Sequence, residues 1–221
     1  MDNKDIVGIG AVSRALESAT KEVRELMHKF LSPAAEEAGQ LFADRIRVAR
    51  ITNIAKLLTK AKAKLDNTGL RINPVALKTF LPILEGCSLE EDEEMIERWS
   101  NLLSSAASST VVLPTYARIL AELTPQEARM VDKIFRLSDL TENLTKGIAV
   151  SELRKLDLLD EQQFQAALLN LQVLRLLERK FEQNTILMSS VPFAIKDADL
   201  VGLTLFGKQF AKAIGNDFQP K

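Results

Sequence analysis

The sequence has few of the residues that build catalytic and metal sites. Its 221 residues include one cysteine, Cys87, and one histidine, His28. A single cysteine excludes an internal disulfide, and a single histidine excludes a metal site built on a histidine pair within one chain. A Ser-His-Asp triad would need His28, which lies in the charged stretch KEVRELMHKF and is typical of a surface helix. We therefore expect no catalysis, no cofactor and no metal ion.

Long apolar runs and a strong net charge are also missing. No run reaches the roughly 18 apolar residues that a spanning helix needs, and the N-terminus lacks the basic start and apolar core of a signal peptide. The formal net charge of −1 gives no overall attraction to nucleic acid or anionic lipid. With the single cysteine, these features predict a cytoplasmic protein, and peripheral binding at the inner membrane is a second option.

Helix-forming residues make up most of what is present. Nine glycines, seven prolines and 5% aromatic residues accompany an apolar fraction of 46%, in which leucine, alanine, isoleucine and valine prevail. Apolar spacing predicts helices over residues 6–31, 33–66, 73–84, 88–108 and 114–122. Gly86 is expected to break the third of them, and Asn67-Thr68-Gly69 to end the second.

The last hundred residues follow a different pattern. A capping box at Thr124-Pro125-Gln126-Glu127 predicts a helix start, and Asp160 and Thr204 predict two more. We expect helices over 125–137, 150–156, 161–180 and from 204 on, and strands over 185–188 and 201–203. LTLFGKQF at 203–210 resembles the LTxxGxxF ending of many winged-helix domains. The predicted fold is mostly α: an N-terminal helical region over 1–110, then a winged-helix-like domain with a short β-hairpin over 111–221.

The densest charge lies at the start of the helix predicted over 88–108. Ser88 is expected to cap it, with Glu91 as the capping-box partner. The acidic residues crowd the positive end of the helix dipole, and three of them, Glu91, Asp92 and Glu94, are candidate interaction residues. Carboxylate pairs at helical neighbour spacing, Glu90 with Glu94 and Glu94 with Glu97, also suit Mg²⁺ or Ca²⁺. No second carboxylate cluster completes such a site, so stabilisation of the helix start is the better account.

The only tryptophan, Trp99, follows in the same helix. Together with Leu102 and Leu103 it is expected on the buried side of the helix, because the three share one helical face. An exposed ring would instead be a binding platform, so Trp99 is also a candidate interaction residue.

A basic stretch lies earlier in the chain. Residues 45–64 contain seven cations and no acid. On a helix, one face carries four cations, Arg45, Lys56, Lys60 and Lys64, and the opposite face is apolar. Three interpretations stay open. The cations are a solvated face, or they pair with the acidic run Glu90–Glu94 within the chain or across a dimer, or they bind an anionic ligand such as membrane lipid or nucleic acid.

The candidate recognition helix of the C-terminal half is nearly uncharged. Residues 161–177 contain one base, Arg175, and one acid, Glu161. DNA-binding proteins concentrate lysine and arginine on such a helix, because contacts to phosphates supply much of the affinity. Its glutamines and Asn170 are able to read base edges, but phosphate anchoring is scarce. We therefore expect an architectural or partner-binding role and not specific DNA binding.

Three phrases of the chain carry a family resemblance: PAAEEAGQLFADRIR at 33–47, PILEGCSLEEDEEMIERWSNLLSSA at 82–106 and PTYARILAELTPQEARMVDKI at 114–134. Over residues 33–134 the chain therefore resembles the abortive-infection alpha (Abi-alpha) family of bacterial proteins. Cys87 and Ser100 stand where the family pattern has alanine, and both are small-for-small changes. The resemblance implies a role in bacterial defence against phage and implies no known catalytic residues.

These observations predict a bacterial abortive-infection factor that acts through protein contacts, without catalysis. Its partner would be a phage or host protein, and a second copy of the chain is a further candidate. Two alternatives remain. The first is a membrane-directed effector that places the apolar start 6–12 and the basic helix 45–64 on an anionic bilayer. The second is a transcriptional regulator that binds DNA through the C-terminal half.

Overall fold

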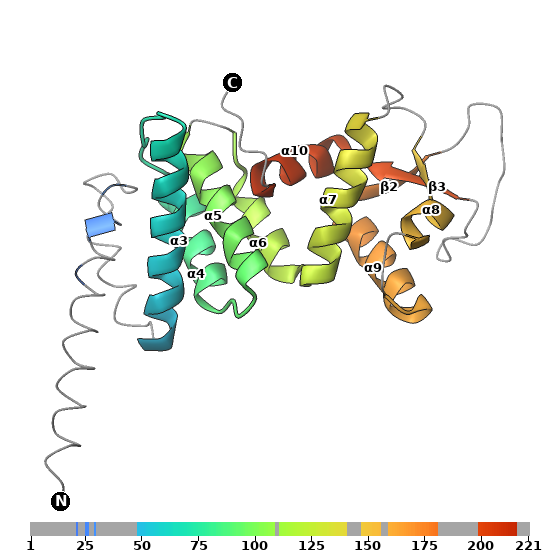
Figure 1. Ribbon diagram of the computed structural model, residues 1–221, viewed down its shortest axis with the longest axis horizontal. Coiled ribbons are helices and arrows are strands. Elements are labelled where there is room, and N and C mark those ends of the chain that lie inside the picture. Colours follow the sequence, from blue (N-terminus) through green and yellow to red (C-terminus); the bar gives the residue numbers. More distant parts are fainter. Residues whose placement is uncertain are drawn as a thin grey trace, which may run out of the picture. The chain divides into compact units, whose positions relative to one another are not determined.

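The computed structural model describes residues 21, 25, 26, 29, 48–108, 111–140, 147–155, 159–180 and 199–215. These residues are mostly helical and include one small antiparallel sheet (Figure 1). No helix in the described part of the chain is both long and apolar enough to cross a membrane. His28, most of the helix predicted over 6–31 and the strand predicted over 185–188 lie outside the described residues.

The chain divides into two compact units, residues 1–121 with 216–221 and residues 122–215. The division into a helical region over 1–110 and a winged-helix-like domain over 111–221 stays a prediction. The first unit contains four described helices, α3 (Val48–Asn67), α4 (Leu77–Ser88), α5 (Glu93–Ala107) and α6 (Pro114–Glu122). The bounds of α6 confirm the prediction for 114–122.

Helix α5 is the centre of the first unit, and both α3 and α4 pack against it (Figure 1). Trp99, Leu102 and Leu103 on α5 are buried, which confirms the predicted inner face. The apolar face of α3 is buried as predicted, through Ile54, Leu57, Leu58, Ala61 and Leu65. Gly69 follows α3 with a φ of 68°, in the left-handed region where glycine commonly ends a helix.

The turn between α4 and α5 differs from the prediction at two residues. The prediction that Gly86 breaks the helix is wrong, because α4 continues to Ser88. Glycine is required at 86 by packing, since a Cβ there would lie 2.3 Å from Cη2 of Trp99. The prediction that Ser88 caps the next helix is also wrong. Asp92 is the N-cap of α5, and its carboxylate accepts a hydrogen bond from Met95 N at 3.0 Å.

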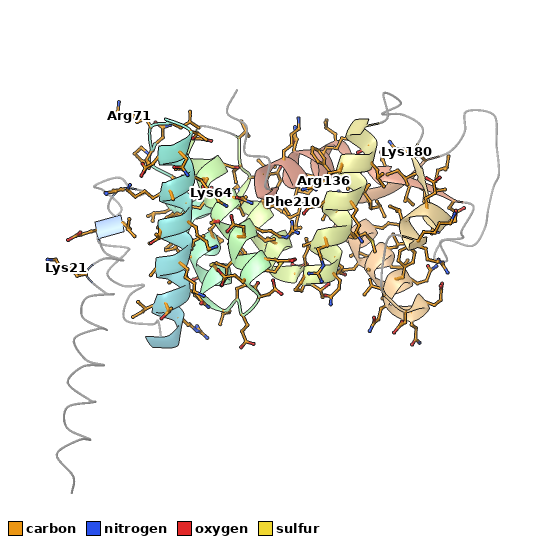
Figure 2. All side chains as sticks on the ribbon, in the orientation of Figure 1. Lys21, Lys64, Arg71, Arg136, Lys180 and Phe210 are labelled. Carbon is orange, nitrogen blue, oxygen red and sulfur yellow. The ribbon has the colours of Figure 1, made fainter. Side chains whose placement is uncertain are left out.

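The second unit combines four helices with the sheet. Its elements are α7 (Pro125–Leu140), β1 (Ile148–Ala149), α8 (Val150–Lys155), α9 (Glu161–Val173), β2 (Leu177–Lys180), β3 (Leu200–Leu203) and α10 (Leu205–Ile214). The sheet order is β1-β3-β2, and both pairs are antiparallel, with Ile148 opposite Val201 and Leu177 opposite Leu203. Helix α7 contacts β1 and β3, and α10, which carries the buried Phe210 (Figure 2), contacts α7 and β3.

Side-chain caps begin three of the four helices of this unit, α7, α9 and α10, as predicted. Thr124 and Glu127 form a reciprocal capping box: Glu127 N donates to the Thr124 hydroxyl at 3.2 Å, and Thr124 N donates to the Glu127 carboxylate at 2.7 Å. Asp160 accepts from Gln163 N at 2.8 Å at the start of α9. Thr204 accepts from the backbone N–H three residues later, also at 2.8 Å, at the start of α10.

The helix predicted over 161–180 is too long, and this prediction is wrong. Helix α9 ends at Val173, and Leu177–Lys180 form strand β2. Arg175 takes a φ of 58° between them, which stops the helix. The start of α10 then packs tightly on this turn, because a Cβ at Gly207 would lie 2.2 Å from Leu176 O. The two-residue strand β1 was not predicted.

Candidate functional site

A row of ion pairs joins the cationic face of α3 to the acidic face of α5. Lys56 Nζ lies 3.0 Å from Glu93, and Lys60 Nζ lies 3.3 Å from Glu93 and 2.8 Å from Glu97. Lys64 also pairs with Glu97. The steps of four residues along both helices bring the charges together in alternation. We call these five residues the lysine–glutamate ladder, and Lys64 marks its more buried end (Figure 2).

The ladder changes the ionisation of its members. Hydrogen bonds from Lys56 and Lys60 lower the pKa of Glu93. Burial raises the pKa of Glu97, but hydrogen bonds from Lys60 and Lys64 outweigh it and lower that pKa below its usual value. The bond to Glu97 raises the pKa of Lys60, whereas burial lowers the pKa of Lys64. The ladder therefore favours the charged forms of Lys60, Glu93 and Glu97.

Buried polar groups of α5 continue the row below the ladder. Lys64 donates to the Ser100 hydroxyl at 3.0 Å and also to the Asn101 side-chain oxygen. Ser104 is fully buried, and its hydroxyl lies 3.2 Å from Ala61 O on α3. Small hydroxyl side chains let the two helices approach closely while their polar atoms stay hydrogen-bonded. The lysines on the polar face of α3 are thus paired within their own unit along two turns.

Glu90 organises the acidic turn that precedes α5. Its carboxylate accepts hydrogen bonds from the backbone N–H groups of Glu91 and Asp92, both at 3.1 Å, and from the Trp99 indole at 3.4 Å. Asn53 on α3 donates to Glu90 O at 2.6 Å. The acidic turn is therefore a fixed structural connection between α3 and α5.

The structure brings together only part of the predicted interaction set. Lys56 and Lys60 join the ladder along with Lys64, and Arg45 lies outside the described residues. Asp92 is the helix cap and Trp99 is core, with 1% of its surface exposed. Glu91 and Glu94 are the predicted acids with exposed side chains.

Sequence reasoning missed two partners that matter most to this site. It named Glu97 only as one end of a carboxylate pair with metal-ligand spacing, and it gave Asn53 no role. The steps from Glu93 to Glu97 and from Lys56 to Lys60 are both four residues, and this match was the available indication of a ladder. No group of three or more metal-ligating side chains occurs in the described residues.

The thiol of Cys87 is buried in the same unit. Burial, with Glu90 nearby, raises its pKa to about 12. Thiolate is the reactive form of cysteine, so this residue is protonated and inert at neutral pH.

The outward face of α9 in the second unit is different in character. The helix contains no lysine or arginine. Glu161, its one acid, pairs with Arg154. Gln162, Gln163 and Val173 are exposed. This face offers amide and apolar groups and little charge.

The chain matches a known protein family over most of its length. The family model described as abortive infection alpha matches residues 46–214. The match reaches beyond the resembling phrases at 33–134 and takes in the second unit up to the end of α10. No curated protein and no solved structure matches the chain at a significant level.

Proposed function

Because the chain belongs to the abortive infection alpha family, we propose that it is a bacterial abortive-infection factor that limits phage growth through protein contacts, without catalysis. The family match is the observation that carries the defence role, since it covers residues 46–214 and so most of the chain. The contact mechanism is inferred from the chemistry of the two faces described above.

The arrangement of the second unit supports a winged-helix-like domain. A helix, a short strand, two helices and a two-stranded hairpin follow in order, and the first strand pairs with the last to give the order β1-β3-β2. Helices α8 and α9 occupy the places of a helix-turn-helix pair. Such a unit presents the second helix of the pair outward, where a partner can reach it.

A protein partner suits this outward helix better than DNA or lipid does. Phosphate groups on either ligand are bound through lysine and arginine, and α9 has neither. The lysines of α3 that would serve a bilayer are occupied by Glu93 and Glu97. Flotation of the purified protein with anionic vesicles at low salt, lost in a Lys56→Ala/Lys60→Ala variant, would argue for a membrane effector instead.

The case against catalysis rests on the residues that would have to do it. The Cys87 thiol has a pKa of about 12 and is enclosed, so it is a poor nucleophile. The charged side chains that act on this thiol are Glu90, which organises the acidic turn, and Glu93 and Lys56, which belong to the ladder. Metal-dependent nuclease activity of the pure protein that disappears in Glu91→Gln or Glu94→Gln would contradict this part of the proposal.

Phage challenge tests the defence role directly. Bacteria expressing the chain are infected at low and at high multiplicity, and phage yield and survival of the infected cells are counted. Abortive infection predicts a reduced phage yield per cell in both cultures, survival of the low-multiplicity culture and collapse of the high-multiplicity culture. Undiminished phage yield, with the protein present at normal levels, would overturn the proposal. Glu91→Gln and Glu94→Gln should protect as well as the unaltered chain.

A further inference from the structure

The outward face of α9 has the spacing of a coiled-coil contact. Gln162, Ala166, Leu169 and Val173 follow at steps of four, three and four residues. This is the spacing of the a and d positions in a heptad repeat. Leu169 is half-buried and the other three are exposed, Val173 by 78%. We call these four residues the α9 seam.

Both sides of the α9 seam carry uncharged amides. The flanking side chains are Gln163, Gln165, Asn170 and Gln172. Asn170 donates to Glu127 of α7 at 2.8 Å, and Gln165 donates to Glu161 at 3.3 Å. An amide also accepts hydrogen bonds, so an identical face can still pair with this one. Like-charge repulsion, which usually opposes contact between identical surfaces, is absent along this row. The face is therefore compatible with a second copy of itself.

The two ends of α9 differ in charge. Asp160 and Glu161 stand at its first turn, where Glu161 also pairs with Arg154 of its own chain. Arg175 is exposed just beyond its last turn. An antiparallel second helix would bring Arg175 of each copy to the acidic end of the other and would set the two helix dipoles head to tail. A parallel arrangement would bring like charges together.

The α9 seam lies on a helix that the core of its own unit already stabilises. Phe164, Leu168 and Leu171 on the opposite side of α9 are buried in the core of the unit. The helix is therefore formed before any partner arrives, and binding does not bear the cost of ordering it. Leu205 adds apolar surface at one end. It is 75% exposed and follows Thr204, whose hydroxyl donates to Arg175 O at 2.7 Å.

From these observations we propose that the α9 seam binds the same seam of a second copy, antiparallel, to form a two-fold symmetric dimer. Gln162 of one copy then faces Val173 of the other, and Ala166 faces Leu169. The small alanine lets the helices approach closely. The proposal rests on the protein-contact function above and names its partner. Four seam residues per copy are few beside the roughly 20–30 residues a side of a standard interface, so dimerisation depends on concentration.

Sedimentation velocity of the purified full chain, over a series of concentrations, tests the dimer. We expect the dimer fraction to rise with concentration. Val173→Glu should raise the dimer dissociation constant by about tenfold or more, because it places a charge in an apolar contact. Val111→Glu is the matched control: the same change at a residue that is 81% exposed in the first unit. It should leave the dimer unchanged, and circular dichroism should show both variants folded.

Disulfide cross-linking tests the orientation. The only natural cysteine, Cys87, is buried, so any cross-link formed comes from the introduced cysteines. Mild oxidation of Gln162→Cys/Val173→Cys should give a covalent dimer, and Val173→Cys alone should not. Efficient cross-linking of Val173→Cys alone would mean that the helices run parallel and would overturn the proposed geometry.

Two results would overturn the dimer itself. One is a monomer at every concentration, and the other is a dimer that Val173→Glu and Val111→Glu affect equally. Binding of a DNA duplex at low salt that Val173→Glu abolishes, without any dimer, would assign α9 to nucleic acid instead. These measurements need no phage, so the protection experiment judges the defence role separately.

Discussion

Helices α3 and α9 each bury one apolar face in their own unit, but they use their polar faces differently. Three lysines of α3 bind Glu93 and Glu97 of α5, so its cations are paired within their own unit. The polar face of α9 carries amides and exposed apolar side chains. The more charged helix is therefore the structural one, and the helix with little charge presents the open face. Cationic residues at helical spacing do not by themselves indicate an anionic ligand.

The largest effect on stability is expected in the buried core of α5, the helix whose acids pair with the lysines of α3. Trp99→Ala should lower the free energy of unfolding by about 3–5 kcal/mol, because a buried ring leaves a large cavity. Chemical denaturation followed by far-ultraviolet circular dichroism measures this. Val111→Ala, at an exposed site, should change stability by less than about 0.5 kcal/mol. A Trp99→Ala protein of unaltered stability would mean that the ring is not a core residue.

The next largest effect on stability is expected where α10 packs on the turn between α9 and β2. Gly207→Ala should destabilise the second unit by about 1–3 kcal/mol, because the new Cβ would lie 2.2 Å from Leu176 O, a backbone atom that cannot swing away. Hydrogen exchange of peptides from 159–180 should become faster. Gly202→Ala is the control, since its Cβ would meet the flexible end of Lys180 at 3.2 Å. Equal effects of the two changes would contradict the tight packing of α10 on the α9–β2 turn.

The ladder should make the first unit sensitive to acid. Glu93 and Glu97 have lowered pKa values in the folded protein, so their contribution is present above the unfolded-state pKa and is lost as pH falls through the folded-state value. Glu97→Gln should cost about 1–3 kcal/mol at neutral pH and flatten the acid dependence, because Lys64 loses its buried partner. Asp66→Asn, which removes only the pair with Lys62, is the control. An unaltered pH profile of Glu97→Gln would show that the ladder contributes nothing.

The smallest effect is expected at the exposed end of the ladder. Lys56 and Glu93 are both about half exposed, so Lys56→Ala should cost less than about 1 kcal/mol. The loss should shrink further in high salt, because solvent-exposed pairs are screened. Urea denaturation at two salt concentrations measures it. A larger loss than that of Glu97→Gln would reverse the ranking of the two ends.

Local chemistry made much of the fold predictable. The caps at Thr124, Asp160 and Thr204 act within three residues of the chain, and all three were found from sequence. The winged-helix order itself stays a prediction. Helix α9 was extended too far because leucines continue its spacing up to 177, whereas the turn at Arg175 is set by pairing of β2 with β3. Such pairing is non-local and leaves little trace in a short window of sequence.

The candidate site was predictable only in outline. The cationic face of α3 and the acidic start of α5 were both recognised, and their pairing was one of three open interpretations. Which acids take part depends on how the two helices pack, so Glu97 was placed in another role. Gly86 shows the same limit. It looks like a helix breaker, and its reason for being glycine is the Trp99 ring thirteen residues later.

The position of the aromatic side chains has a practical consequence. The only tryptophan, Trp99, and the only tyrosine, Tyr116, are both buried in the first unit. Tyrosine and tryptophan absorption and indole emission therefore observe that unit alone, while far-ultraviolet dichroism observes helices in both. Denaturation followed by both signals gives two curves, one from the first unit and one from the helices of both units. Any separation between the curves gives the order in which the two units unfold, without a single added label.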